Sequence, residues 1–442
     1  METVLLYILG ILIIVVGLAV SIGLHEVGHL LPAKLFGVRV GQYMIGFGPT
    51  LFSRKFGETE YGFKAIPMGG YISMSGMYPP ARVGGKAREA STGFFQTLVQ
   101  DARTASADTV ALDEEHRTFY NLPIYKRVII MLGGPLMNLL IGVVLYAVLL
   151  CGFGVAQPST TVGSVSACII SQSSTQTECT SDDPAAPGAA AGLEPGDELL
   201  EMNGTAITSW AQATAIIQDT AGDELVIVVD RDGSELTLTA TPLLTERYVT
   251  DDAGAVVEDA DGNTVTQQVG FLGIGTASET VQQPISAVLP AVGDNVAAVG
   301  NMILNLPQRL VDIAQAAFGS EERDPNGPIG PVGIGRIAGE ITSLDTIPVF
   351  ERASYLIGLV ASLNIALFVF NLVPLLPLDG GHVVGALWEG IRRFFAKIFR
   401  RPDPGPVDTA KIIPLTFVVV IFLGSMSALL VYADIVKPIT LL

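Results

Sequence analysis

The most constraining feature of the chain is an uncharged apolar run, Thr3–Leu24, that leads directly into the pattern His25-Glu26-Val27-Gly28-His29. A helix needs about 20 apolar residues to cross a bilayer, and this run is long enough. Residues four apart share a helix face, so His25 and His29 can present both imidazoles to one metal ion, with Glu26 beside its open position. Ionisable side chains at membrane depth are costly and usually functional. The pattern therefore predicts a metal site at the end of a first transmembrane helix.

The composition points to a membrane and away from nucleic acid. The 442 residues are 49% hydrophobic and carry a net charge of −18. A chain this apolar is not expected to be wholly soluble, so we expect an integral membrane protein whose partner is the lipid bilayer. We expect no nucleic-acid partner, because proteins that bind phosphate backbones concentrate Lys and Arg.

Three further apolar runs are long enough to span a membrane, at Val128–Phe153, about Tyr355–Val373 and Ile412–Tyr432. Basic residues cluster in the loops between spans one and two and between spans three and four. They are Lys34, Arg39, Arg54, Lys55, Lys64, Lys126 and Arg127 in the first loop, and Arg392, Arg393, Lys397, Arg400 and Arg401 in the second. The positive-inside rule places both loops in the cytoplasm. Both termini are then extracytoplasmic, and the metal pattern lies toward the cytoplasmic side.

The segment Pro284–Phe318 admits two interpretations. Its apolar residues recur at helical spacing, and it also carries Asp294, Asn295, Asn301 and Asn305. These polar side chains favour an amphipathic helix along the membrane surface over a fifth span.

Between spans two and three the pattern changes to a soluble domain. The run from Ala190 to Gly204, with its A-G-L-x-P-G-D-x-L-L-x-x-N-G spacing, resembles a PDZ domain of the bacterial protease type. An unrelated β-rich domain is the alternative. The resemblance implies a groove for an extended peptide or a trimmed substrate, with Gly192, Leu193, Gly196 and Asp197 at it. Cys168 and Cys179 in this domain are either a small disulfide loop or two free thiols.

Two histidines leave a catalytic zinc site one protein ligand short. Asp379 is the only acid between Glu351 and Glu389, and it ends an apolar run in which a carboxylate needs a partner. The Pro and Gly residues around it suggest an irregular backbone that turns this carboxylate inward. We therefore expect Asp379 to be the third ligand, with His382 as the competing candidate.

Taken together, the motifs resemble the site-2 protease family of intramembrane zinc metalloproteases. They are the H-E-x-x-H pattern, Gly134-Pro135-Leu136-Met137-Asn138, and N-x-x-P-x-x-P-L-D-G-G from Asn371 to Gly381. The single PDZ-like domain is similar to the bacterial type that acts in regulated intramembrane proteolysis. The resemblance implies one Zn²⁺ per chain, a bacterial plasma membrane, and single-span membrane proteins as substrates. Examples of such substrates are pre-trimmed anti-sigma factors and remnant signal peptides.

The resemblance also implies residue roles. Glu26 would act as general base, and Asn371 would hold the substrate backbone. Residues that would support the site are Gly134, Asn138, Pro374, Pro377 and Gly380, with Asn138 assigned mainly to helix packing. We further hypothesise that a strand edge around Tyr61–Ser75, including Ile66, Tyr71 and Ile72, holds an unwound substrate over the metal.

The predicted fold class is a polytopic α-helical membrane protein of about four transmembrane helices with an inserted extracytoplasmic α+β PDZ-like domain. The predicted transmembrane segments are 1–36, 125–154, 353–382 and 411–436. Between them lie a cytoplasmic loop with membrane-associated β elements (37–124), the PDZ-like domain (158–283), an interfacial segment (284–352) and a cytoplasmic basic segment (383–410). The alternative function is a non-catalytic PDZ scaffold with a structural metal, which would have four protein ligands and no need of Glu26.

Overall fold

A computed structural model describes most of the chain. The described residues are 2–79, 99, 101, 103–104, 106, 108–110, 115–170, 179–180, 183–249, 257, 264–319, 323–324, 327–407 and 409–439. They form two compact units. A helical unit comprises Met1–Phe153 and Gln283–Leu442, and a β-rich unit comprises Gly154–Gln282.

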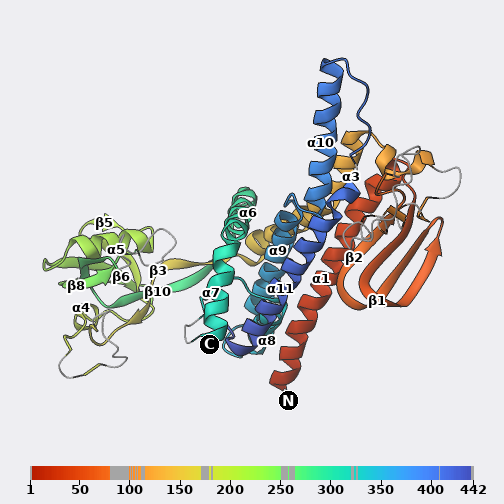
Figure 1. The fold of residues 1–442 in the computed structure, drawn as a ribbon. Helices are drawn as coiled ribbons and strands as arrows, with labels where there is room; N and C mark the ends of the chain where they lie inside the picture. Colours follow the sequence, from red (N-terminus) through yellow and green to blue (C-terminus); the bar gives the residue numbers. More distant parts are fainter. Residues whose placement is uncertain are drawn as a thin grey trace. The chain divides into compact units, whose positions relative to one another are not determined.

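The helical unit is built from long apolar helices (Figure 1). Its long helices are α1 (Glu2–Leu35), α3 (Ile124–Ala147), α6 (Val288–Leu304), α9 (Val349–Asn371), α10 (Asp379–Ile398) and α11 (Ile413–Val436). The π-helical turn η3 (Val148–Phe153) extends α3, and α7 (Leu306–Phe318) and α8 (Pro331–Ser343) are shorter. Single 3₁₀ turns are η1 (Glu115–Arg117), η2 (Phe119–Asn121), η4 (Ile285–Ala287) and η5 (Thr409–Ile412).

Helices α1 and α3 run antiparallel and approach each other closely at two glycines. A Cβ atom on Gly28 would lie 2.2 Å from the carbonyl oxygen of Gly133, and one on Gly133 would lie 2.0 Å from that of Gly28. Only residues without a side chain permit this backbone approach, as at other membrane helix interfaces. The approach brings the middle of α3 against the end of α1 that carries the histidines.

Helix α9 runs parallel to α1. The ladder of contacts begins where a Cβ on Gly17 would touch Val360, and it continues with the Asn364 Nδ2 atom donating to Ser21 Oγ at 2.9 Å. Further along, the residues that follow α9 reach His25. A buried amide needs a partner in an apolar interior, and Ser21 supplies it.

The chain leaves α3 and enters α9 at the same end of the helical unit. The rings of Phe153 and Phe350 stack there, with centroids 4.5 Å apart. Thr342 at the end of α8 donates to the carbonyl of Leu6 near the start of α1. The segment between α3 and α9 therefore begins and ends at the same end of the helical unit. Helix α6, which lies in this segment, does not move the chain to the opposite end.

Among the described residues, five helices are long and apolar enough to cross a membrane, one more than the four expected. They are Glu2–Leu35, Ile124–Phe153, Ile285–Leu304, Val349–Asn371 and Ala410–Val436. The additional one contains α6, for which the sequence favoured a surface position because of its polar residues. One of those residues, Asn295, donates to Ser362 Oγ of α9 at 3.0 Å, so its amide faces a neighbouring helix. Polar residues that pair across helices are compatible with a membrane interior, so these residues do not by themselves exclude α6 from crossing a membrane, and its surface position stays a prediction.

A twisted sheet of β1 (Val40–Phe56) and β2 (Thr59–Met74) lies beside α1 (Figure 1). The pairing is antiparallel, and both long strands bend so that one part of β1 pairs with two parts of β2. Residues 42–45 pair both with 60–63 and with 70–73. Residues 42–45 are therefore central, while residues 70–73 have a strand partner on one side only among the described pairings. Tyr43 fixes the sheet to α1 by donating its hydroxyl to the carbonyl of Gly23 at 2.7 Å.

The β-rich unit contains a six-stranded sheet in the order β10-β3-β4-β6-β7, with β5 paired to β4. The strands are β3 (Val155–Val165), β4 (Glu198–Met202), β5 (Thr205–Ala206), β6 (Leu225–Arg231), β7 (Ser234–Ala240) and β10 (Ile274–Val281). A separate hairpin pairs β8 (Leu243–Tyr248) with β9 (Thr266–Phe271), and the helices are α4 (Pro187–Ala190) and α5 (Trp210–Asp219). Ser209 caps α5 by accepting from the backbone of Gln212.

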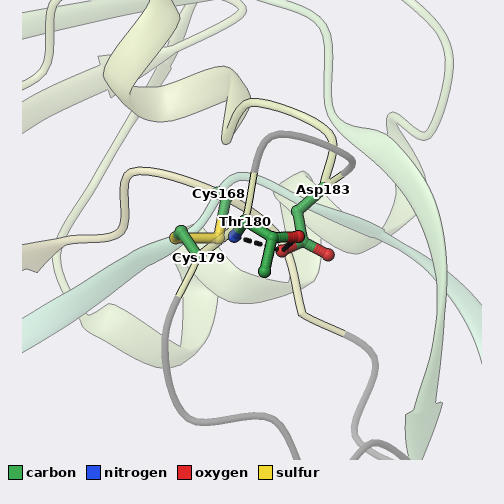
Figure 2. The surroundings of a disulfide bond; sticks show 4 residues. All are labelled: Cys168, Cys179, Thr180 and Asp183. Atoms are coloured by element: carbon green, nitrogen blue, oxygen red, sulfur yellow. Dashed lines mark hydrogen bonds between the residues drawn. A yellow bond between two sulfur atoms is a disulfide. The ribbon is translucent and has the colours of Figure 1, made fainter.

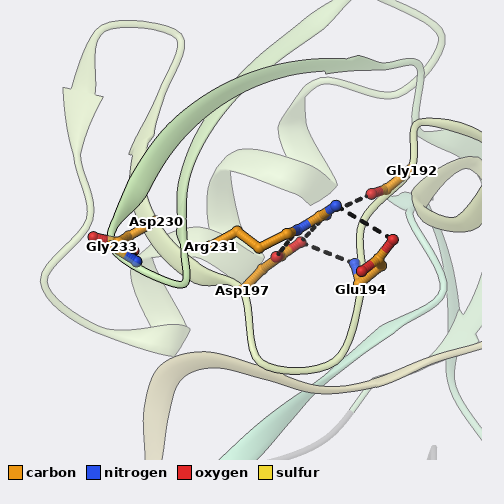
Figure 3. A network of polar contacts seen from close by, with 6 residues as sticks. All are labelled: Gly192, Glu194, Asp197, Asp230, Arg231 and Gly233. Carbon is orange, nitrogen blue, oxygen red and sulfur yellow. Dashed lines mark hydrogen bonds and ion pairs between the residues drawn. The ribbon is translucent and has the colours of Figure 1, made fainter.

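The Gly192–Asp197 turn stabilises this unit through side chains that pack and pair inside it. Leu193 is buried in the hydrophobic core. Asp197 is fully buried and pairs with Arg231 at 2.7 Å, while the backbone N–H of Glu194 donates to it (Figure 3). The side chains of Leu193 and Asp197 thus point into the unit, and the position of residues 192–197 at a binding groove stays a prediction. The sequence of a turn does not reveal whether its side chains point inward.

Cys168 and Cys179 form a disulfide, with Cα atoms 5.9 Å apart (Figure 2). The sequence left this open between a bond and two thiols. The loop beyond Cys179 is closed by Asp183, which accepts from the backbone and the hydroxyl of Thr180.

The Asp197–Arg231 pair makes the stability of the β-rich unit depend on pH. Hydrogen bonds from Arg231 hold the pKa of the Asp197 carboxyl below its ordinary value. A lowered folded-state pKa stabilises the fold above the unfolded-state pKa of about 3.9, and this contribution disappears as pH falls toward the folded-state value. We expect Asp197→Asn to lower the urea midpoint at pH 7 and to flatten its decline between pH 5 and pH 3.

Trp210 fluorescence in a Trp388→Phe background reports unfolding of this unit alone, since these are the chain's two tryptophans. Asp232→Asn, at an exposed turn position, is the matched control and should leave the curve unchanged. An Asp197→Asn curve that matches the parent at every pH would contradict the assignment.

Candidate metal centre

Three side chains from two helices converge at the end of α1. The Nε2 atoms of His25 and His29 lie 3.1 Å apart, and each lies 3.3 Å from Oδ2 of Asp379. Together these residues form the one group of potential metal ligands identified among the described residues. The structure thus brings together the three predicted ligands.

The spacing of these atoms fits a tetrahedral zinc site. Zn–N and Zn–O bonds of about 2.0–2.1 Å in a tetrahedron place ligand atoms about 3.3–3.4 Å from one another. The three observed separations, 3.1, 3.3 and 3.3 Å, are close to this edge length. Oδ2 of Asp379 is moreover a buried acceptor without a hydrogen-bond donor. A carboxylate oxygen in that state needs a cation, so these residues fit the metal.

Both imidazoles are held in the tautomer that a metal ligand needs. Nδ1 of His25 lies 2.9 Å from Oδ1 of Asn138, and Nδ1 of His29 lies 2.7 Å from the carbonyl oxygen of Ile130. Both partners are acceptors, so each Nδ1 carries the proton and each Nε2 presents its lone pair to the metal position. The sequence analysis assigned Asn138 mainly to helix packing, and its contact gives it a more specific position beside His25.

A tight turn delivers Asp379 to this position. The chain reverses between the end of α9 at Asn371 and the start of α10 at Asp379. A Cβ atom on Gly380 would lie 2.4 Å from the carbonyl oxygens of both Leu372 and Val373, so this turn requires glycine. Pro374 is exposed within the turn, and the Leu376–Pro377 peptide bond is cis.

His382, the competing third ligand, is not part of the convergent group. It lies in the first turn of α10, one turn beyond Asp379. The carboxylate at the helix start therefore occupies the position next to both imidazoles.

Glu26 lies beside the three ligands, buried between α1 and the sheet. The backbone N–H of Ile72 hydrogen-bonds to its carboxylate, and a Cβ on Gly70 would lie 3.2 Å from Glu26 Cγ. Gly70 and Ile72, in the segment of β2 that has a strand partner on one side only, therefore lie against Glu26.

Gly134 leaves the space that the two imidazoles need. A Cβ atom on this residue would lie 2.2 Å from Nε2 of His29 and 2.7 Å from Nε2 of His25. Gly134 is within a regular helix, so a special backbone conformation does not explain the glycine. The absence of a side chain explains it.

The other predicted site residues lie around this centre with less specific contacts. Asn371 is half-buried at the end of α9, and Tyr71 donates its hydroxyl to Gln42. Ile66 is exposed on β2. The sequence analysis missed the buried pair Ser21–Asn364, although Ser21 stands one helical turn before His25 and Asn364 stands two turns before Asn371.

The comparisons with known proteins agree with this geometry. The family model described as peptidase family M50 matches residues 13–400. The chain belongs to peptidase family M50. This confirms the resemblance to the site-2 protease family that the three motifs indicated.

Several curated relatives match nearly the whole chain. Zinc metalloprotease Rip1 of Mycobacterium tuberculosis is 31% identical over 447 residues, which cover 99% of both chains. Zinc metalloprotease Rip1 of Mycolicibacterium smegmatis is 30% identical over 98% of both chains. Metalloprotease MmpA of Caulobacter vibrioides is 29% identical over 87% of this chain and 88% of that protein.

The space at Gly134 can be tested directly. We expect Gly134→Ala to reduce the zinc content of the purified protein at least tenfold, because the added methyl group overlaps both Nε2 atoms. Metal analysis by mass spectrometry measures this without any assay of activity. Gly424→Ala on α11 is the matched control, because nothing lies within 4 Å of its added Cβ. Full zinc occupancy in Gly134→Ala would show that the metal is held elsewhere.

Proposed function

We propose that this chain is an intramembrane zinc metalloprotease that hydrolyses peptide bonds within or near the transmembrane segment of single-span membrane proteins. The observation that carries the proposal is the position of Glu26 beside three convergent ligands at the end of an apolar helix. A structural zinc site has four protein ligands and no base, whereas a catalytic site has three and keeps one position for water. Membership of family M50 and the names of the zinc metalloprotease relatives support it.

The chain's own residues supply the remaining chemistry. His25, His29 and Asp379 would hold the zinc, which would supply a bound water of lowered pKa and polarise the scissile carbonyl. Glu26 takes the proton of that water as general base and passes it to the leaving amine. Asn138 and the carbonyl of Ile130 keep both imidazoles oriented throughout.

A transmembrane substrate hides its peptide bonds in helical hydrogen bonds, so it has to be unwound before cleavage. The edge of β2 at residues 70–73 is suited to hold the unwound segment, because it has a strand partner on one side only and lies close to Glu26. A groove of about 430 Å³ runs along this edge, lined by Gln42, Tyr71, Ile72 and Ser73 among others. Strand addition here places an extended substrate beside the base and the metal. Asn371, at the end of α9, is proposed to hold the substrate backbone.

The β-rich unit is proposed to be a PDZ-like domain that binds an extended peptide or a trimmed substrate. A groove of about 210 Å³ lies between α5 and the β9–β10 segment, lined by Trp210, Thr214 and Phe271 among others. Arg247 borders it, stacked 3.7 Å from the centroid of the Phe271 ring, and its Nε is buried without a partner. A guanidinium in that state is suited to a carboxylate, such as the end of a trimmed chain.

The proposed location is a bacterial plasma membrane, with the active site toward the cytoplasmic side. Basic residues in the two loops favour this orientation, and Lys126 and Arg127 stand at the start of α3. The Cys168–Cys179 disulfide favours an oxidising compartment for the β-rich unit. Pre-trimmed anti-sigma factors and remnant signal peptides are the proposed substrate types. The alternative function, a scaffold with a structural metal, does not explain why an acid such as Glu26 lies beside the ligands.

A variant of Glu26 distinguishes the protease from the scaffold. We expect Glu26→Gln to retain zinc and to lower the cleavage rate by about 10²–10⁴-fold, because the amide cannot accept the proton. The measurement is quantitative proteomics of membranes, in which single-span fragments accumulate only with the variant. Asp294→Asn on α6, the same change of an acid to its amide away from the ligands, is the control. A folded, zinc-loaded Glu26→Gln protein that causes no accumulation would favour the scaffold.

The free edge of β2 has its own test. We expect Ile72→Pro to abolish cleavage while zinc stays bound, because proline removes the N–H that faces Glu26 and blocks pairing at the edge. Ile72→Val keeps the N–H and should cleave at nearly the parental rate. Cleavage and zinc content are measured on the purified protein with one single-span substrate. Unchanged cleavage by Ile72→Pro would rule out substrate binding at this edge.

A further inference from the structure

One face of α3 orients both histidines of the metal centre. Asn138 accepts from Nδ1 of His25, and the carbonyl of Ile130 accepts from Nδ1 of His29. Arg127 stands three residues before Ile130 and eleven before Asn138, so all three lie on the same side of the helix. All three are buried. The face of α3 that holds the histidines therefore also presents a buried guanidinium.

This guanidinium pairs with an acid in the middle of α10. Nη2 of Arg127 lies 2.6 Å from Oε1 of Glu389, and the exposed fractions of the two side chains are 7% and 1%. Glu389 also meets Arg393 at 2.9 Å and accepts from the backbone N–H of Val407 at 3.0 Å. Arg393, which also pairs with Asp403 at 3.5 Å, lies on α10 itself, and Val407 follows that helix in the chain. Among the described residues, Arg127 thus makes the one ion pair between α3 and α10.

Asp379, the third ligand, lacks the support that each histidine has. In the part of the chain that the structure describes, its carboxylate forms ion pairs or hydrogen bonds only with the imidazoles of His25 and His29. Groups that orient a ligand from behind normally contribute to metal affinity. Because the described residues offer Asp379 no such group, the direction of its carboxylate depends on where the backbone of α10 lies.

Helix α10 is continuous from Asp379 to Glu389. At 1.5 Å per residue, these two residues lie about 15 Å apart along the helix axis. Next to Glu389, a Cβ atom on Gly390 would lie 3.3 Å from Cδ1 of Ile124, the first residue of α3. Apolar packing of this kind is non-directional, whereas a charged hydrogen bond between two buried side chains specifies one position. The ion pair therefore sets the position of α10 along α3, and with it the position of Asp379.

We propose that the Arg127–Glu389 ion pair positions the metal ligand Asp379 by fixing α10 along α3. One face of α3 then holds all three ligands, the two histidines directly and Asp379 through α10. A buried ion pair adds little net stability, because the loss of hydration offsets its attraction. Holding a ligand in place explains why such a pair stands here. Arg127 and Glu389 are thus positioning residues, and they act through a helix rather than at the metal.

A second buried pair in the helical unit serves as the comparison. Arg323 lies 2.9 Å from Asp434 of α11, and the exposed fractions of the two side chains are 4% and 0%. Asp434 also accepts from the backbone N–H groups of Gly330 and Gly333. This pair resembles the first in its burial and in its backbone support, but α11 carries none of the three ligands. A purely structural role would make the two pairs equivalent for metal binding.

The zinc affinity of the full-length protein tests the proposal. Arg127→Gln removes the ionic link to α3, while Glu389 keeps Arg393 and the Val407 N–H. We expect the dissociation constant for zinc to rise about tenfold or more, as when other groups that support a metal ligand are removed. It is measured in detergent by competition with a chromophoric chelator. With Co²⁺ as the bound metal, the visible absorption of the variant should also differ from that of the parent, because it reports ligand geometry.

Arg323→Gln is the matched control, since it breaks a pair of the same kind and Asp434 keeps its two backbone N–H groups. Both variants should lower the thermal unfolding midpoint of the metal-free protein. We expect Arg323→Gln to keep the zinc dissociation constant within about twofold of the parent, because it is independent of the metal centre. An equal rise in both variants would overturn the proposal, because lower stability would then explain it. A parental zinc constant or a parental Co²⁺ spectrum in Arg127→Gln would overturn it as well.

Glu389→Gln tests the same link if Arg127→Gln does not fold. This change keeps the size of the side chain and removes its charge, and Asp434→Asn is its control. The same rise of about tenfold is expected, and a parental dissociation constant would overturn the proposal. None of these measurements depends on cleavage of a substrate. Failure of the positioning role is therefore distinguishable from failure of the proposed protease function.

Discussion

The structure depends on holding two imidazoles and a carboxylate next to one another near the C-terminal end of an apolar helix. Such a group is costly in a membrane unless a cation joins its members. The separations among His25, His29 and Asp379 suit a tetrahedral ion. To reach them, α3 has to approach α1 to backbone contact at Gly28 and Gly133. The close helix packing is therefore a condition for the metal centre.

Two other buried acids of the helical unit are arranged differently from Asp379. Glu389 meets two arginines and one backbone N–H, and Asp434 meets one arginine and two backbone N–H groups. Their contacts resemble those of structural ion pairs, which hold helices together. Oδ2 of Asp379 instead faces only ring nitrogens and lacks a donor. This contrast distinguishes an acid suited to bind a metal from acids that are already paired with arginine.

The helix that carries Asp379 is held at two points. Its first turn belongs to the metal centre, and its middle is held to α3 by the Arg127–Glu389 ion pair. The sheet on the other side brings the Ile72 N–H to Glu26. Base, ligand and proposed substrate edge thus come from three segments far apart in the sequence. Their relative positions are fixed by packing around α1.

The sequence by itself determined the chemistry of the centre and the approximate course of the chain. The spacing of His25, Glu26 and His29 depends on helical periodicity, which is local, and Asp379 stood out because an acid is rare in an apolar run. The tertiary structure decided what depends on neighbours far along the chain. It placed Asn138 on His25, directed Asp197 inward to Arg231 rather than to a groove, and satisfied Asn295 through Ser362. Side-chain direction at these positions follows from which helix or strand packs opposite, and no local pattern contains that information.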